Sequence, residues 1–158
     1  MDENVRPRDR RGLSLPEPVP GLVIRYSYVW RREADEGEES GRKRRPRAVI
    51  LSVQRSDDEL IVYVAPITHS APKQPWEAIA LSGAIRRRLG LDDLPSWIVT
   101  TEFNAFRWPG ADLAMLPEEL APGEVAYGTL PSILVDRIVD QFRDNTGRGR
   151  VRAVKRTE

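Results

Sequence analysis

Residues 48–70 read AVILSVQRSDDELIVYVAPITHS, and this stretch decides the fold. Two apolar runs rich in β-branched residues, 48–53 and 60–67, flank a short polar stretch, SDDE, that is typical of a turn. The pattern predicts a β-hairpin in which Arg55 lies opposite Leu60. The register of this hairpin allows distances between polar groups to be predicted from the sequence.

The open end of the hairpin is expected to bring a basic group and a hydroxyl together. In the predicted register, Thr68 lies opposite Arg47 and diagonal to Arg45, within reach of an arginine side chain. Successive side chains of a strand point to opposite faces, so His69, the only histidine, is expected on the other face from Thr68. A guanidinium beside a hydroxyl suits a phosphate and needs no metal. The alternative is an ordinary surface arginine and a threonine that caps the strand.

The rest of the chain predicts short strands and one long helix. Residues 22–30 alternate with a period of two, which predicts a half-buried strand. Behind Pro131, apolar residues recur at helical spacing as far as Phe142. Short strands of this kind with one or two helices indicate a mainly β fold with α, a small antiparallel barrel. Further strands are expected at 76–81, 96–103 and 125–127, and a short helix at 84–89.

The composition is that of one soluble domain. The chain has 158 residues, 40% hydrophobic and 31% charged, with a net charge of +1. It has no cysteine, which excludes disulfides and thiolate sites, and its first twenty residues contain no apolar stretch of the signal-peptide or membrane-spanning kind. We therefore expect a cytoplasmic protein without a membrane partner. The expected organisation is a flexible N-terminal arm (1–19), a barrel domain (20–144) and a loose basic C-terminal tail (145–158).

The order and spacing of several segments resemble the MazF/PemK family of toxin endoribonucleases from type II toxin–antitoxin pairs. The resemblance covers about residues 20 to 144. The segments that carry it are PGLVIRYSYVW (20–30), GRKRRPRAVILS (41–52), VAPITHS (64–70), WIVTTEF (97–103) and YGTLPSILVDRIVDQF (127–142).

The resemblance implies an SH3-like barrel with a C-terminal helix that forms a homodimer. It also implies cleavage of single-stranded RNA without metal or cofactor, by attack of the ribose 2′-hydroxyl on phosphorus, and a cognate antitoxin as partner. By position, Arg45 and Thr68 match the residues that hold the scissile phosphate, and Glu102 matches an acidic residue near the reaction centre. Around Glu102 the chain reads TEFNAFRWPG, so the family's arginine there is missing or displaced to Arg107.

Other residues are candidates for proton transfer or RNA binding. His69 has a side chain whose ordinary pKa suits proton transfer, and it ranks after Glu102. Trp108 precedes Pro109 in a predicted loop and is a candidate for stacking on a base, whereas Trp97 is assigned to the core. The basic candidates for RNA contact are Lys43, Arg44, Arg86, Arg87 and Arg88, whose alternative is a solvated surface.

Two functions of other classes stay open. The first is a non-catalytic barrel that binds a protein, as the gyrase-poisoning toxin CcdB does. The second is a degenerate family member that binds RNA without cutting it, which the altered surroundings of Glu102 favour. An acidic run at 33–39 lies directly before the basic run at 42–45 and could occupy a basic site when no substrate is bound.

Overall fold

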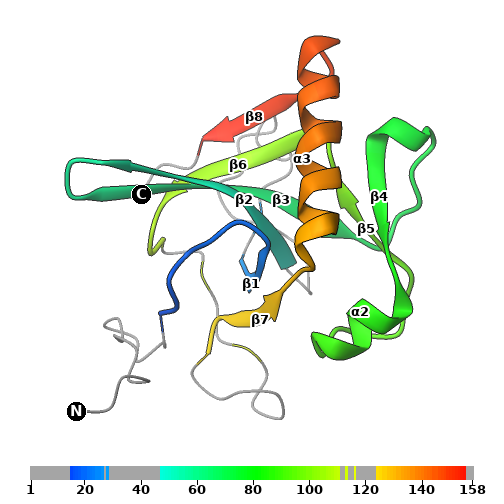
Figure 1. Cartoon of the computed structure of the whole chain (residues 1–158), viewed down its shortest axis with the longest axis horizontal. Helices are drawn as coiled ribbons and strands as arrows, with labels where there is room; N and C mark the ends of the chain where they lie inside the picture. Colours follow the sequence, from blue (N-terminus) through cyan, green and yellow to red (C-terminus); the bar gives the residue numbers. More distant parts are fainter. Residues whose placement is uncertain are drawn as a thin grey trace.

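The computed structural model describes residues 15–26, 28, 47–110, 113, 116 and 124–155 (Figure 1). The acidic run at 33–39 and the predicted site residues Lys43, Arg44 and Arg45 lie outside these ranges. The elements in chain order are β1 (Leu22–Arg25), β2 (Arg47–Ser56), β3 (Glu59–Thr68), the 3-10 turn η1 (Pro75–Glu77), β4 (Ala78–Leu81), α2 (Gly83–Arg88), β5 (Ser96–Val99), β6 (Glu102–Arg107), β7 (Ala126–Thr129), α3 (Ser132–Gly147) and β8 (Arg152–Lys155).

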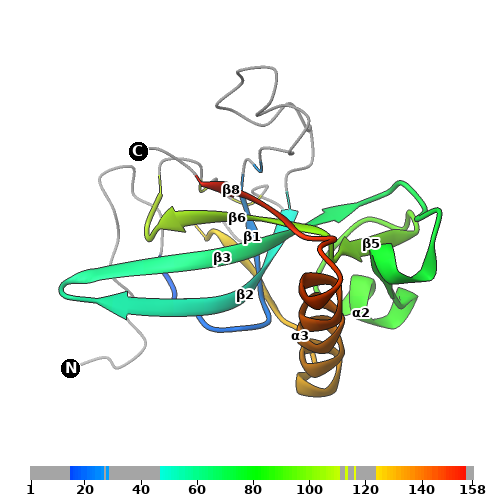
Figure 2. The same ribbon diagram turned by 90° about the horizontal axis from the view of Figure 1, so that it is seen from above.

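The described strands form one eight-stranded, mainly antiparallel sheet that curls into a half-barrel (Figure 2). The order along it is β4-β5-β3-β2-β1-β7, while β6 pairs with β3 and carries β8 on its other side. The β6–β8 pairing is parallel and the other strand pairs are antiparallel. A mainly β fold with one long C-terminal helix is therefore confirmed. None of the described helices is long and apolar enough to cross a membrane.

Two hydrophobic cores lie on the two faces of the sheet. The inner core fills the curl of the sheet and contains Ile24, Tyr26 and Phe106. The rings of Tyr26 and Phe106 stack with their centroids 4.5 Å apart. The outer core lies between the sheet and α3 and contains Val23. Residues 22–24 are thus buried on both faces, and the expectation of a half-buried strand is wrong for them because α3 covers the face that was assigned to solvent.

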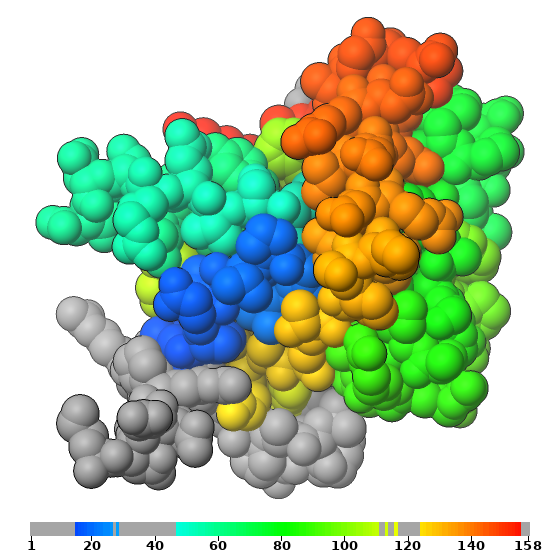
Figure 3. Space-filling model, in the orientation of Figure 1, coloured from blue at the N-terminus to red at the C-terminus, as the bar shows by residue number. Residues whose placement is uncertain are grey.

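Helix α3 begins after Pro131, as predicted, and lies across the outer face of the sheet. Leu134, Ile138 and Phe142 point toward the sheet and belong to the outer core. Figure 3 shows the helix between the projecting β2–β3 hairpin and the β4–α2 region. Both regions are therefore fixed to the same helix.

The β2–β3 hairpin has the predicted register near its turn and a different one near its open end. Arg55 pairs with Leu60, as predicted, but the register shifts between Ile50 and Ser52. Beyond this bulge Ala48 pairs with Pro66, one position away from the predicted pairing. Arg47 is therefore not opposite Thr68, and the predicted face of residues 47–50 relative to β3 is reversed.

Three other expectations are corrected by the structure. The predicted strand 96–103 is two strands, β5 and β6, separated by Thr100 and Thr101. Residues 152–155 form β8 instead of a loose tail, and α3 continues to Gly147. Residues 15–19 lie against the barrel, where Leu15 packs on the inner core.

Candidate functional site

A polar pocket of about 440 Å³ opens where β3 and β6 meet the β4–β5 pair. Val62 and Val64 of β3 point into the inner core, and the alternation of the strand places Thr68 on the same face. Glu102 is the first residue of β6. The pocket therefore continues the inner face of the half-barrel at its end. Its described lining residues are Thr68, Ser70, Ala71, Pro72, Lys73, Glu77, Ala78, Val99, Thr101 and Glu102.

Thr68 is the last residue of β3, and its side chain both caps the strand and lines the pocket. Its Oγ1 accepts a hydrogen bond from the backbone N–H of Ser70 at 3.1 Å. Accepting this bond uses one lone pair of the hydroxyl and leaves its proton as a donor. The residue is 9% exposed, so its orientation is fixed by its surroundings. A capping role and a donor role toward a ligand are therefore compatible.

Glu102 is held from inside the barrel by a buried tyrosine. The hydroxyl of Tyr28 donates to Oε1 of Glu102 at 3.2 Å. Burial, together with the negative charge of Glu102, raises the pKa of Tyr28 well above its ordinary value, so the phenol stays protonated and acts as the donor. Tyr28 was not among the predicted site residues. The alternation of residues 22–30 placed it on the inner face, but nothing local to it indicated that it would meet Glu102.

The pocket carries more negative than positive charge among its described residues. Lys73 contributes an ammonium group, while Glu77 and Glu102 contribute carboxylates. Oε1 of Glu77 accepts the backbone N–H groups of Lys73 and Gln74 at 2.7 and 2.6 Å, which fixes η1. Glu77 therefore has a structural role. A phosphate in this pocket would need additional positive charge from neighbouring segments.

His69 points away from the pocket, as the alternation of a strand predicts. Its Nε2 lies 3.1 Å from Oδ1 of Asp92, and Arg47 donates to Oδ2 of the same carboxylate at 2.9 Å. The guanidinium of Arg47 also lies over the ring of Tyr127, 5.5 Å from its centroid. We call His69, Asp92, Arg47 and Tyr127 the Asp92 cluster. Arg47 and His69, which the predicted register places on opposite faces, thus lie together on the outer side.

The Asp92 cluster is internally paired. The side chains of Arg47 and Asp92 are only 11% and 19% exposed. Burial alone would raise the pKa of Asp92, but hydrogen bonds from Arg47 and the Leu94 amide outweigh it and hold that pKa well below its usual range. Burial likewise opposes the charge on Arg47, and the bonds to Asp92 and Tyr127 reverse that effect and raise its pKa. These groups are charged and engaged with one another, as in a structural ion pair.

The structure places both Trp97 and Trp108 at partly buried positions. Trp97 was assigned to the core, but Ser96 and Ile98 are the buried residues of β5 and Trp97 is half-buried on the other face. It pairs with Thr68 across the sheet. Trp108 packs against the inner core, with its ring 6.1 Å from that of Phe106. Trp97 therefore lies opposite a residue that lines the pocket, and the period of two within β5 is the signal that places it on this face.

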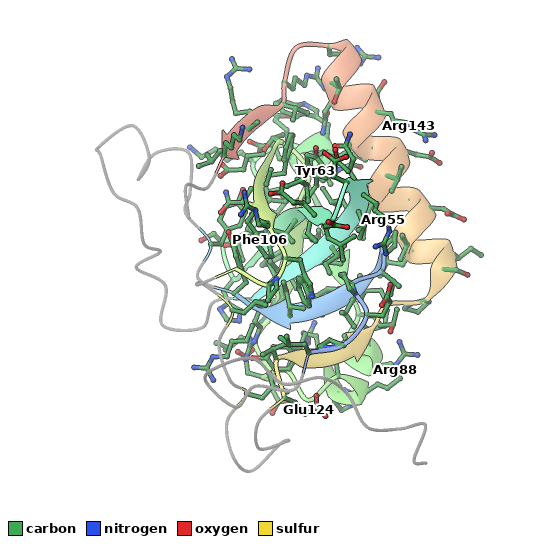
Figure 4. The ribbon with its side chains drawn as sticks, turned by 90° about the vertical axis from the view of Figure 1, so that its left-hand side faces the viewer. Arg55, Tyr63, Arg88, Phe106, Glu124 and Arg143 are labelled. Atoms are coloured by element: carbon green, nitrogen blue, oxygen red, sulfur yellow. The ribbon has the colours of Figure 1, made fainter. Side chains whose placement is uncertain are left out.

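The arginines of α2 do not line the pocket. Arg86 donates to the carbonyl of Leu81 at 2.7 Å, and Arg88 donates to the carbonyl of Thr129 at 2.9 Å. In Figure 4 Arg88 lies beside β7, toward the opposite end of the view from Tyr63. Arg87 is exposed on the same short helix. The described contacts of Arg86 and Arg88 fix α2 to the sheet.

A second, apolar groove of about 350 Å³ lies between α3 and the sheet. Tyr63 on the sheet and Arg143 on the helix line it from two sides (Figure 4). Its remaining lining residues are Leu51, Ser52, Phe103, Val139, Phe142 and Thr146. The lining offers no carboxylate or imidazole to move a proton, so the polar pocket is the better candidate for chemistry. Within the described ranges, no group of three or more acidic or histidine side chains is placed to hold a metal ion.

No family model, curated protein or solved structure matches this chain.

Proposed function

We propose that the protein is a metal-independent endoribonuclease that cleaves single-stranded RNA in the polar pocket. One observation carries the proposal: the hydroxyl of Thr68 and the carboxylate of Glu102, from distant parts of the chain, line the same pocket. A hydroxyl can donate to a phosphate oxygen, and a positioned carboxylate can accept the proton of the attacking 2′-hydroxyl. The MazF/PemK resemblance selected the same two residues from their sequence context.

In the proposed reaction the carboxylate of Glu102 takes the proton of a ribose 2′-hydroxyl. The 2′-oxygen forms a bond to phosphorus while the bond from phosphorus to the 5′-oxygen breaks, and the leaving 5′-oxygen takes a proton from water. The products are a 2′,3′-cyclic phosphate and a 5′-hydroxyl. Thr68 donates to a non-bridging phosphate oxygen, and the ammonium of Lys73 offsets the charge that grows there.

The remaining positive charge in this proposal comes from the basic run that precedes β2. Ala48 pairs with Pro66, so β2 enters the sheet at the end of β3 that carries Thr68. Arg45 lies two positions before Arg47 in the sequence, and Lys43 and Arg44 precede it. Because of the bulge, the hairpin register no longer predicts that Arg45 and Thr68 share a face. Arg45 is therefore included in the proposal for its charge and for its match to the family pattern. A homodimer and an acidic antitoxin that covers these cations belong to the same proposal.

One observation favours a second candidate, a barrel that binds RNA or a protein partner without cleavage. The family's arginine near Glu102 is either missing from this chain or displaced to Arg107. Arg107 pairs with Glu59 at 2.9 Å, at the turn end of the hairpin. It is not among the described residues that line the pocket. A pocket without this cation would stabilise the transition state less well.

The test is cleavage of a mixed-sequence single-stranded RNA by the purified protein in EDTA. We compare the wild type with Thr68→Ala, Glu102→Gln and Arg45→Ala, with Arg55→Ala on the hairpin as the matched control. The proposal expects cleavage by the wild type and the control, with 5′-hydroxyl ends, and strong loss in the other three. Equal cleavage by all five proteins would remove the site assignment. RNA binding without cleavage by the wild type would select the second candidate.

A further inference from the structure

The chain after α3 returns to the polar pocket. It turns at Gly149, which has a φ of 69°, and enters β8 parallel to β6. The backbone N–H of Arg152 donates to the carbonyl of Thr101 at 2.9 Å, and Arg152 is paired in register with Glu102. Both Thr101 and Glu102 line the pocket. Side chains of register partners point to the same face, so Arg152 lies beside the proposed base.

A second arginine, Arg150, lies between the turn at Gly149 and β8. The guanidinium of Arg150 lies over the ring of Trp76 at 4.0 Å from its centroid. Trp76 directly precedes Glu77 of the pocket, and its carbonyl accepts hydrogen bonds from Thr100 and Asn145, both at 2.9 Å. The backbone that carries this ring is therefore held in place. A guanidinium stacked on an aromatic ring keeps its N–H groups in a plane from which they can reach a ligand.

These two cations differ from the neighbouring Arg148 in their pairing. Arg148 forms an ion pair with Asp144 at 3.2 Å on the exposed side of α3. Within the described part of the chain, no carboxylate pairs with Arg150 or Arg152. The guanidinium of Arg152 instead donates to the carbonyls of Gly149 and Val151 at 3.3 and 3.2 Å. The described lining of the pocket carries more negative than positive charge, so cations at its margin that form no ion pair with a described carboxylate are available to an anionic ligand.

We propose that Arg150 and Arg152 form a clamp that binds the phosphodiester backbone of single-stranded RNA beside the nucleotide in the pocket. We call these two residues the β8 clamp. The choice of RNA rests on the proposed function. Arg150 and Arg152 lie at the margin of a pocket that has Trp76 beside Glu77 and Trp97 opposite Thr68, and proteins that bind single-stranded nucleic acids combine cations with aromatic rings. Because the clamp contacts the backbone next to the reacting phosphate, it contributes binding and positioning and leaves the chemical step to the pocket.

The test measures binding separately from cleavage. The probe is a fluorescent oligoribonucleotide with 2′-O-methyl groups, which cannot supply the attacking hydroxyl, and its anisotropy is followed at several salt concentrations. We expect Arg150→Ala/Arg152→Ala to bind at least about tenfold more weakly and to lower the salt slope by about 1.4, since each phosphate contact on a single strand contributes about 0.7. Arg148→Ala is the matched control and should bind as the wild type does. Arg152→Gln alone, at an exposed position, should give about half the change in slope if the double variant does not fold.

Three outcomes separate the clamp from the proposed function. Clamp-dependent binding by a protein that never cleaves RNA would support the clamp and overturn the ribonuclease. Cleavage with unchanged affinity and salt slope in the double variant would overturn the clamp alone. If polyglutamate, and not the RNA probe, binds in a manner that depends on Arg150 and Arg152, the clamp serves an acidic protein segment and the RNA assignment is wrong. For an active enzyme, we further expect KM to rise with little change in kcat.

Discussion

The two sides of the end of β3 carry similar residue types in different arrangements. On the inner side, Thr68 and Glu102 face a pocket of about 440 Å³. On the outer side, Arg47 and His69 converge on Asp92 at 2.9 and 3.1 Å. The outer side contains His69, whose side-chain type suits proton transfer, yet its groups are engaged with one another. The inner side has the pocket into which a ligand can enter.

The difference shows that pairing, more than residue type, separates a structural cluster from a candidate site. Arg47 and Asp92 lose most of their hydration, and their mutual hydrogen bonds offset that cost. Changing one partner should therefore affect stability. The pocket residues are held from behind, by Ser70 and by Tyr28, with the pocket in front of them. Changing one of them should affect activity more than stability.

The largest expected effect is on the inner side. Glu102→Gln keeps the shape of the side chain and removes the proposed base, so the rate of RNA cleavage should fall by about 10²–10⁴-fold. Single-turnover kinetics in EDTA measure this rate. Glu59→Gln, at the ion pair with Arg107 on the hairpin, is the matched control and should keep the wild-type rate. A Glu102→Gln protein that retains full activity would exclude Glu102 as the base.

On the outer side, Asp92→Asn should lower the free energy of unfolding by about 2–3 kcal/mol, because it leaves the charge of Arg47 without its partner in a largely buried place. Urea unfolding measures the change. The exposed pair offers the comparison: Asp144→Asn should cost less than about 1 kcal/mol. Similar losses in the two variants would mean that the Asp92 cluster is no more than a surface ion pair.

The same cluster predicts how stability depends on pH. The folded-state pKa of Asp92 lies below its unfolded value, so its contribution is fully present above about pH 4 and is lost as the pH falls toward the folded value. The free energy of unfolding should therefore fall less between pH 7 and pH 2.5 in Asp92→Asn than in the wild type. Identical profiles for the two proteins would show that Asp92 does not carry this dependence.

The smallest expected effect concerns the aromatic residue beside Thr68. Trp97→Leu should weaken binding of a non-cleavable RNA by roughly 1–2 kcal/mol, the range for one stacked base. Trp108→Leu should instead lower the midpoint of urea unfolding and leave RNA affinity unchanged, because Trp108 packs on the inner core. Fluorescence anisotropy and urea titration separate the two effects. The reverse result would restore Trp108 as the stacking residue.

Local patterns predicted the elements but not the places where they deviate. The β2–β3 turn and the helix after Pro131 follow from alternation and helical spacing, and both are confirmed. The bulge between Ile50 and Ser52 falls within the strand-forming run 48–53, where no glycine or proline marks it. One inserted residue moved Arg47 from the predicted inner side to the Asp92 cluster.

The remaining errors arise from long-range contacts. The apolar run 96–103 breaks where Thr100 is buried and bonded to the carbonyl of Trp76 and to Asn145 of α3. The basic residues after α3 suggested a loose tail, yet β6 provides a free edge on which residues 152–155 form β8. Neither partner is visible within a short window of sequence. Pattern alone proposed Thr68, and the family resemblance proposed Glu102, but only the fold brings them into one pocket with β8 at its margin.

The most direct test of the difference between the two sides compares neighbouring residues of one strand end. Thr68→Val and His69→Gln each remove one polar function with little change in size, and both proteins are tested for single-turnover cleavage of the same RNA in EDTA. We predict that Thr68→Val loses at least about tenfold in rate, the loss expected for one transition-state hydrogen bond, while His69→Gln cleaves at the wild-type rate. Loss of cleavage in His69→Gln with full activity in Thr68→Val would place the chemistry on the Asp92 side and contradict the account.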